Sequence, residues 1–172
     1  MKSGAGSKAK GASFERQCCK RLSLWLSQGT RDDLLWRSSM SGGRATVQLA
    51  VGKVNLTQSG DVSAVGQGAY EFCERTFTEI KHYRALQMDR GFLCGTGNLV
   101  KFWRVARREA EKYGKRPLLV ARQNLYPTLA ITDAHDDVFD CQPLMVLVHW
   151  GANVRLFDDA TAYVKPQMRR RA

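Results

Sequence analysis

The segment Thr-Phe-Thr-Glu-Ile-Lys at residues 76–81 decides the fold that we expect, because it has the composition of a β-strand and carries both a carboxylate and an amine. Side chains alternate between the two faces of a strand, so Glu79 and Lys81 share one face and Ile80 lies on the other. An acid and a lysine that leave a strand side by side are suited to bind a hard cation and a charged substrate next to it. We therefore expect the chain to be organised around this pair.

The length and the charge of the chain limit its function. With 172 residues it fits one domain that has a core of its own. It carries 27 Lys and Arg residues against 16 Asp and Glu residues, which gives a net charge of +11. This charge favours a polyanionic partner over a small acidic metabolite. Nucleic acid is the first candidate partner and an anionic membrane surface is the second.

Membrane-spanning and disulfide-rich classes of protein do not match the sequence. No apolar run approaches the roughly 18–20 residues needed to cross a bilayer, and residues 1–12 lack the apolar segment of a signal peptide. The five cysteines include no Cys-x-x-Cys pair, so neither a disulfide framework nor a zinc site is indicated. We expect a soluble, cytoplasmic protein.

Apolar periodicity and turn residues predict a single α/β domain with a central mixed β-sheet flanked by helices. We place it at residues 11–165, between a flexible basic tail at 1–10 and a basic tail at 166–172. A basic helix followed by an apolar strand indicates a crossover back to the sheet. The predicted helices are 11–28, 83–88 and 99–113, and the predicted strands are 34–39, 61–65, 76–81, 118–121, 128–132, 144–149 and, at an edge, 154–157.

Asp61 opens the predicted strand 61–65, which we expect to pair with strand 76–81 as a hairpin. Asp61 and Glu79, with the backbone carbonyl of Ile80, would then supply the few oxygen ligands that Mg²⁺ takes from a protein. Lys81 would orient or activate the attacking water, or neutralise charge that builds on a scissile phosphate. Asp61 is also a common turn residue, so this pattern alone leaves a structural role open.

Glu15 lies in the first turn of the predicted helix 11–28, one residue after Phe14 on its apolar face. An acid at a helix start is favoured by the helix dipole, and periodicity alone supports that structural role. In the functional alternative, Glu15 lies beside Asp61 and Glu79 and reaches the metal through a water molecule or holds a second ion.

These residues carry a resemblance to the PD-(D/E)XK nuclease superfamily, which has the restriction-endonuclease-like fold. The pattern consists of Gly60-Asp61, then Glu79-Ile80-Lys81 after residues 62–78, with Glu15 on an N-terminal helix. With Arg37 and the Ser/Gly loop that follows it, the chain is similar to archaeal-type Holliday junction resolvases and their phage-encoded relatives. Gly60 replaces the proline of the motif, the insertion 45–59 is long, and the region after Ala134 has no counterpart.

The resemblance implies a metal-dependent endonuclease of branched DNA, with four-way junctions as substrate and a role in DNA recombination. It makes Glu15, Asp61, Glu79 and Lys81 the catalytic residues, with Mg²⁺ as the cofactor and Mn²⁺ as a substitute. Two incisions on a two-fold substrate favour a homodimer. If the protein is phage-encoded, it acts in the host cytoplasm.

Basic residues on the loop after the first strand and on helix 99–113 are the candidate DNA contacts. Because no base-reading motif is present, we expect recognition by shape and backbone charge. The candidates are Arg37, Ser41, Arg44, Lys101, Arg104, Arg107, Arg108 and Lys112.

Three other functions stay open at this point. A less structure-selective phage or restriction-type endonuclease would cut linear duplex as readily as branched DNA. A non-catalytic nucleic-acid-binding protein would bind tightly and in a salt-sensitive way without cutting. A membrane-surface protein would need an exposed apolar stripe on helix 99–113, and we expect that stripe to lie in the core.

Overall fold

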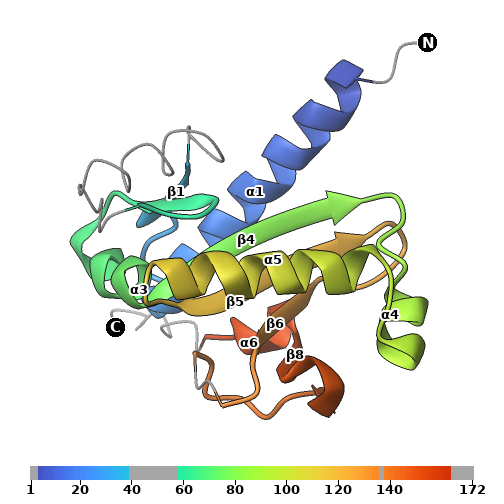
Figure 1. Cartoon of the computed structure of the whole chain (residues 1–172). Helices are drawn as coiled ribbons and strands as arrows, with labels where there is room; N and C mark the ends of the chain where they lie inside the picture. Colours follow the sequence, from blue (N-terminus) through green and yellow to red (C-terminus); the bar gives the residue numbers. More distant parts are fainter. Residues whose placement is uncertain (1–3, 39–57, 136–137, 164–172) are drawn as a thin grey trace, which may run out of the picture.

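A five-stranded mixed sheet forms the centre of the computed structural model, which describes residues 4–38, 58–135 and 138–163 (Figure 1). Its strand order is β4-β5-β6-β8-β7. Strands β4 and β5 are parallel and the other neighbours are antiparallel, which confirms the expected α/β fold with a mixed sheet. The strands are β4 (Thr76–Tyr83), β5 (Arg116–Gln123), β6 (Leu129–Asp133), β7 (Met145–Leu147) and β8 (Ala152–Leu156).

Two helices connect the parallel strands β4 and β5. The chain leaves β4, forms α4 (Met88–Cys94) and α5 (Asn98–Lys112), and returns to the sheet as β5. Parallel neighbours need such a crossover, because a tight turn joins only antiparallel strands. The predicted crossover is therefore confirmed.

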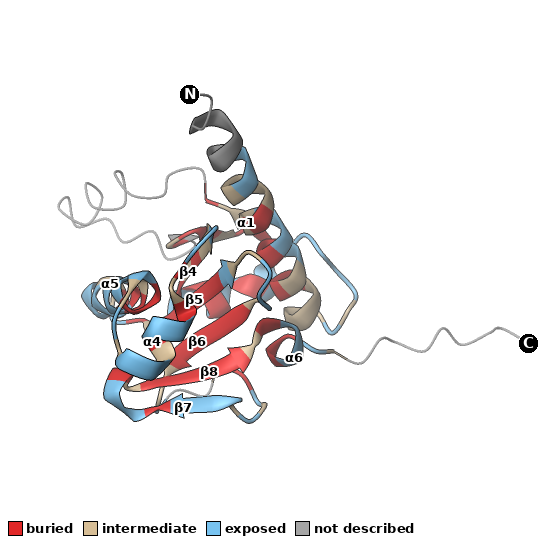
Figure 2. Ribbon diagram, turned by 90° about the vertical axis from the view of Figure 1, so that its right-hand side faces the viewer, coloured by how far each residue is buried: buried red, intermediate tan, exposed pale blue. Residues whose placement is uncertain are grey.

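Helices cover both faces of this sheet (Figure 2). α1 (Gly4–Leu26) and α6 (Phe157–Ala160) pack on one face, and α4 and α5 pack on the other. Strand β5 shows why both faces are covered, since Leu118 and Val120 belong to the core on the α1 side, and Leu119 and Ala121 to the core on the α5 side. A strand that is apolar on both faces belongs in the interior of a layered α/β fold.

A smaller sheet carries the segment before β4. It has the order β1-β3-β2, with β1 (Leu35–Arg37), β2 (Gln58–Ser59) and β3 (Val62–Ala64). The predicted hairpin of strands 61–65 and 76–81 is wrong, because the only β-pairing between the described parts of the two sheets is a single parallel bridge between Gly60 and Thr78. The helices η1 (Gln67–Ala69) and α3 (Tyr70–Arg75) occupy the connection and bury Phe72 and Cys73. This helical crossover makes the two segments run parallel.

Several predicted boundaries also change. α1 begins at Gly4, so the first helix starts earlier than the predicted residue 11. The helix expected at 83–88 begins only at Met88, because β4 continues to Tyr83, whose ring stacks on Phe102. β8 lies inside the sheet, and β7 is the edge in its place. No described helix is long and apolar enough to cross a membrane.

Candidate active site

Strand β4 places Glu79 and Lys81 on the face of the sheet that α5 covers. The Nζ of Lys81 lies 6.0 Å from the centre of the Phe102 ring of α5. Ile80, between the two, belongs to the core on the α1 side. The alternation predicted from residues 76–81 is therefore present in the structure, and both functional side chains leave the same face.

Asp61 reaches this site from the turn between β2 and β3. Its backbone N–H donates a 2.8 Å hydrogen bond to the carbonyl of Thr78 in β4. Its carboxylate accepts a 2.8 Å hydrogen bond from the backbone N–H of Ile80. The residue is only 5% exposed. Two main-chain bonds thus fix Asp61 against β4, although the two segments are not a hairpin.

Gly60 makes this close approach of Asp61 to β4 possible. Its φ is +69°, and a Cβ at this position would lie 2.3 Å from the carbonyl oxygen of Thr78. A side chain cannot fit against backbone at that distance, and proline is excluded because its ring fixes φ near −65°. The glycine in place of the motif's proline therefore has a structural reason in this chain.

Lys81 forms ion-pair contacts with both acids. Its Nζ forms an ion pair with Glu79 and lies 3.6 Å from the Oδ2 of Asp61. All three side chains are largely withdrawn from solvent. The structure therefore brings Asp61, Glu79 and Lys81 together at one point, from two different sheets.

Burial and mutual repulsion shift the protonation of these groups. Burial raises the pKa of Asp61 above its ordinary range, against the opposing effect of Lys81. Burial also raises the pKa of Glu79, and the neighbouring charge of Asp61 adds to this rise. Burial lowers the pKa of Lys81, but the two carboxylates outweigh it, so the pKa of Lys81 is raised overall. Two crowded carboxylates of this kind gain from a nearby cation.

Glu15 comes from α1 and stands at the margin of this group. Its ion-pair partner is Arg37 of β1. Its charge is close enough to contribute to the raised pKa of Asp61. The structure thus brings Glu15 near the site but binds it to Arg37, a residue that we expected to contact DNA.

The donor set fits a hard divalent cation that keeps most of its water. Asp61 and Glu79 supply two carboxylates, and Mg²⁺ is commonly bound through one or two carboxylates plus water and substrate phosphate. Within the described residues there is no group of three or more His, Cys, Asp or Glu side chains placed to hold a metal. Water and substrate phosphate would complete the shell of an ion held by these two carboxylates.

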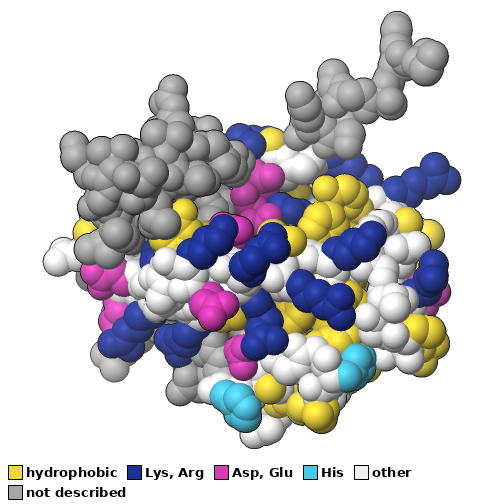
Figure 3. Space-filling view, in the orientation of Figure 1, with side chains coloured by type: hydrophobic (Ala, Val, Ile, Leu, Met, Phe, Trp, Pro, Cys, Tyr) yellow, Lys and Arg dark blue, Asp and Glu magenta, His cyan; other side chains and the backbone are white. Residues whose placement is uncertain are grey.

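Basic side chains gather over α5 (Figure 3). Lys101 and Arg104 are exposed, and neither has an ion-pair partner among the described residues. Arg107 donates a hydrogen bond to the carbonyl of Trp150 and forms an ion pair with Asp133. Arg108 and Lys112 lie within 4 Å of Glu109. The proposed contacts Ser41 and Arg44 fall outside the described residues.

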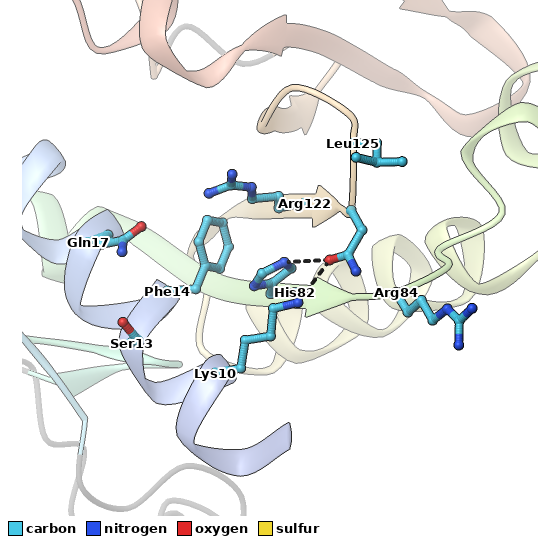
Figure 4. Close-up of a pocket in the computed structure, with 9 residues that line it drawn as sticks. Lys10, Ser13, Phe14, Gln17, His82, Arg84, Arg122 and Leu125 are labelled. Atoms are coloured by element: carbon cyan, nitrogen blue, oxygen red, sulfur yellow. Dashed lines mark hydrogen bonds between the residues drawn. The ribbon is translucent and has the colours of Figure 1, made fainter. Parts of the chain in front are cut away.

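A pocket on the opposite face of β4 is a feature that the sequence did not lead us to predict. It has a volume of about 590 Å³ and lies between α1, β4 and β5 (Figure 4). His82, the residue after Lys81, points into it. The alternation of side chains already places His82 on this face, but the contribution of α1 depends on tertiary packing.

Comparison with known proteins identifies a family for this chain. A family model described as "Phage putative PDDEXK endonuclease" matches residues 6–158. This range includes most of the first helix, both sheets and the three converging side chains. No curated protein and no solved structure matches the chain.

Proposed function

This chain belongs to the phage PD-(D/E)XK endonuclease family, and we propose that it hydrolyses phosphodiesters of branched DNA, with a four-way junction as the favoured substrate. Membership makes it a nuclease of the PD-(D/E)XK superfamily, whose members generally use divalent metal ions. The observation that carries the proposal is the convergence of Asp61, Glu79 and Lys81 at β4.

Each of the three residues has a role that follows from its surroundings. Asp61 and Glu79, with the carbonyl of Ile80, would hold Mg²⁺, and Mn²⁺ has the same preference for oxygen ligands. When bound, the ion supplies positive charge beside the scissile phosphate. Lys81 lies within reach of both acids and is cationic, so it orients the attacking water or stabilises charge on the phosphate. Glu15 acts from the margin, through water.

The preference for a junction rests on the resemblance to resolvases and on the net charge of +11.

A four-way junction needs two symmetric cuts, so we extend the proposal to a homodimer that acts in the cytoplasm of the host. The edge strand β7 and its flanks expose the apolar side chains Leu144, Val146 and Val148. An exposed apolar edge is a usual place for a second copy to pack. Sedimentation of the wild type and of Val146→Lys tests this extension, which predicts a dimer that the substitution weakens.

Divalent-dependent cleavage of labelled DNA tests the proposal. The wild type should cut a four-way junction in Mg²⁺ or Mn²⁺ faster than a linear duplex of the same sequence. Asp61→Asn and Lys81→Ala should lose this activity. The control variants Glu71→Gln and Lys20→Ala remove exposed charges of the same kinds and should keep it.

The other outcomes identify the alternatives. Equal cutting of linear and branched DNA would indicate a less selective endonuclease. Salt-sensitive binding without any cutting would indicate a nucleic-acid-binding protein. Equal activity in the wild type and Lys81→Ala would contradict the assignment of the site.

A further inference from the structure

We propose that the pocket on the α1 face of β4 binds an unpaired nucleotide of the DNA substrate, across the strand from Lys81. The inference rests on the proposed nuclease function and makes its substrate more specific, namely DNA in which a strand separates from the duplex at the cut site.

The size and origin of the pocket suit one nucleotide or a little more. Its volume of about 590 Å³ lies within the range of about 300–1,000 Å³ that is usual for ligand sites. Three segments of the chain build it, so its shape depends on the folded core. Its lining consists of Lys10, Ser13, Phe14, Gln17, His82, Arg84, Arg122, Asn124 and Leu125.

The charge of the lining favours a phosphate-bearing ligand. Lys10, Arg84 and Arg122 are cationic, and the lining contains no acid. Arg84 points away from His82 and lies at the rim (Figure 4). Clefts with one sign of charge attract the opposite ion, and single-stranded nucleic acid is bound in positively charged grooves.

The half-buried ring of His82 and the exposed guanidinium of Arg122 provide a surface for a base, and the ring of Phe14, which is only 5% exposed, packs against both. Phe14 and His82 lie with their ring centres 5.0 Å apart, and the guanidinium of Arg122 lies 5.8 Å from the centre of the Phe14 ring. Unpaired bases stack on aromatic rings and on the plane of arginine. A phosphate alone would need only the cations, so the rings favour a whole nucleotide.

Polar groups beside these rings are fixed in orientation. The Oδ1 of Asn124 accepts hydrogen bonds from Nζ of Lys10, at 3.1 Å, and from Nε2 of His82, at 3.2 Å (Figure 4). Because Oδ1 can only accept, this contact places the proton of a neutral His82 ring on Nε2. The Nδ1 of His82 is then an acceptor that is buried and has no hydrogen-bond partner within the described residues. The amide of Asn124 keeps its N–H groups for the edge of a base.

A second hollow continues the pocket along α1. It has a volume of about 290 Å³ and shares Phe14, Gln17 and Arg122 with the first. It adds another cation, Arg21, another ring, Tyr126, and one acid, Asp158. A short stretch of single strand, and not only one nucleotide, therefore has a path along this helix.

The position of the pocket relative to Lys81 defines the substrate. Lys81 and His82 are neighbours in β4 but lie on opposite faces. β4 is the edge of the larger sheet, and in the described parts of the chain its only pairing on that side is the bridge at Thr78. A DNA that straddles the free edge of β4 would have one strand at Lys81 and the other in the pocket. Paired strands of a linear duplex do not separate in this way, whereas strands diverge at the branch point of a four-way junction, a fork or a flap.

Binding of a short single strand tests the pocket without any cleavage. The probe is a trinucleotide with 2-aminopurine between two thymidines, whose fluorescence falls when the base stacks. We expect the full-length protein, without divalent metal, to bind and quench the probe. Arg122→Gln and Lys10→Gln should each weaken binding about tenfold, because loss of stacking or phosphate contact typically has an effect of this size. Lys20→Gln, an exposed lysine on another face of α1, is the matched control.

Cleavage gives the second measurement. The ratio of fork cleavage to linear-duplex cleavage should fall in Arg122→Gln and stay unchanged in Lys20→Gln. Equal binding and quenching in the wild type and both pocket variants would overturn the inference, as would a wild type that does not bind the probe. A wild type that binds and quenches the probe but cuts no DNA would contradict the nuclease function while supporting the pocket.

Discussion

The carboxylate of Asp61 is hydrogen-bonded to the backbone N–H of Ile80, so the smaller sheet supplies an acid that the main chain of the larger sheet holds in place. Because the donor is a backbone group, the bond does not depend on the side chain at position 80. It also survives when the acid is replaced by an amide, whose oxygen accepts in the same way.

Asp61→Asn should therefore separate activity from stability. The amide keeps the bond to Ile80 but removes the negative charge that holds a cation. We expect the melting temperature to change by only a few degrees and the cleavage rate to fall at least about 100-fold. Calorimetry and junction cleavage measure the two effects. A variant that unfolds as its activity falls would contradict this separation.

Lys81→Met should destabilise the protein more at high pH than at low pH. The pKa values of Asp61 and Glu79 are raised even beside Lys81, and without this cation they rise further. The repulsion between the acids disappears as the pH falls and they take up protons. We expect a loss of about 1–3 kcal/mol in the free energy of unfolding at pH 8, and a smaller loss at pH 5. Urea titrations at the two pH values measure it, with Lys20→Met as the control.

Binding of Mg²⁺ should strengthen as the pH rises. Protons and cations compete for Asp61 and Glu79, whose raised pKa values extend this competition above the ordinary carboxylate range. The increase in melting temperature caused by Mg²⁺ should therefore be larger at pH 8 than at pH 5.5. Asp61→Asn should lose most of this increase. A metal effect that is larger at low pH would be contrary to the assigned ligands.

Glu15 and Arg37 allow a comparison between a structural and a catalytic role. Both variants, Glu15→Gln and Arg37→Gln, break the same ion pair, and the pair is partly exposed, so each should cost at most about 1 kcal/mol of stability. If Glu15 acts at the site, Glu15→Gln lowers cleavage well beyond Arg37→Gln. Equal loss of cleavage in both would assign Glu15 to structure alone. Single-turnover rates with saturating metal measure the difference.

The cations of α5 should divide into two groups. Lys101→Gln and Arg104→Gln remove exposed charges and should each reduce the slope of log binding constant against log salt by about 1. Arg107→Gln instead removes the bonds to Trp150 and Asp133, so it should lower the melting temperature. Salt titrations of DNA binding and thermal unfolding distinguish the groups. An identical salt effect in all three variants would contradict this division into DNA-contacting and structural cations.

Sequence periodicity was sufficient to predict features that depend on a single helix or strand. The alternation in residues 76–81 correctly predicted that Glu79 and Lys81 leave one face of a strand. The apolar stripe of residues 99–113 correctly predicted α5 and its buried side, including Trp103 and Ala106. These patterns follow directly from the geometry of a strand and of a helix.

Features that depend on how helices and strands pack could not be predicted from sequence periodicity. The connection between Asp61 and Glu79 looks like a turn in the sequence, but its apolar residues Phe72 and Cys73 become buried as a helix and convert a hairpin into a crossover. Arg37 and Arg107 look like free cations, yet their partners come from distant segments. The first helix begins earlier than its apolar stripe indicates, because that stripe marks only the part of the helix that packs on the sheet.

The β-pairing between the described parts of the two sheets is limited to one bridge, and this affects how the molecule loses activity. Denaturant that loosens the smaller sheet alone would remove Asp61 while Glu79 and Lys81 stay on an intact β4. Sub-global opening of this kind requires less free energy than complete unfolding. Cutting would then stop at a denaturant concentration where most of the chain is still folded, so the assembly of the site reports whether the two sheets are docked.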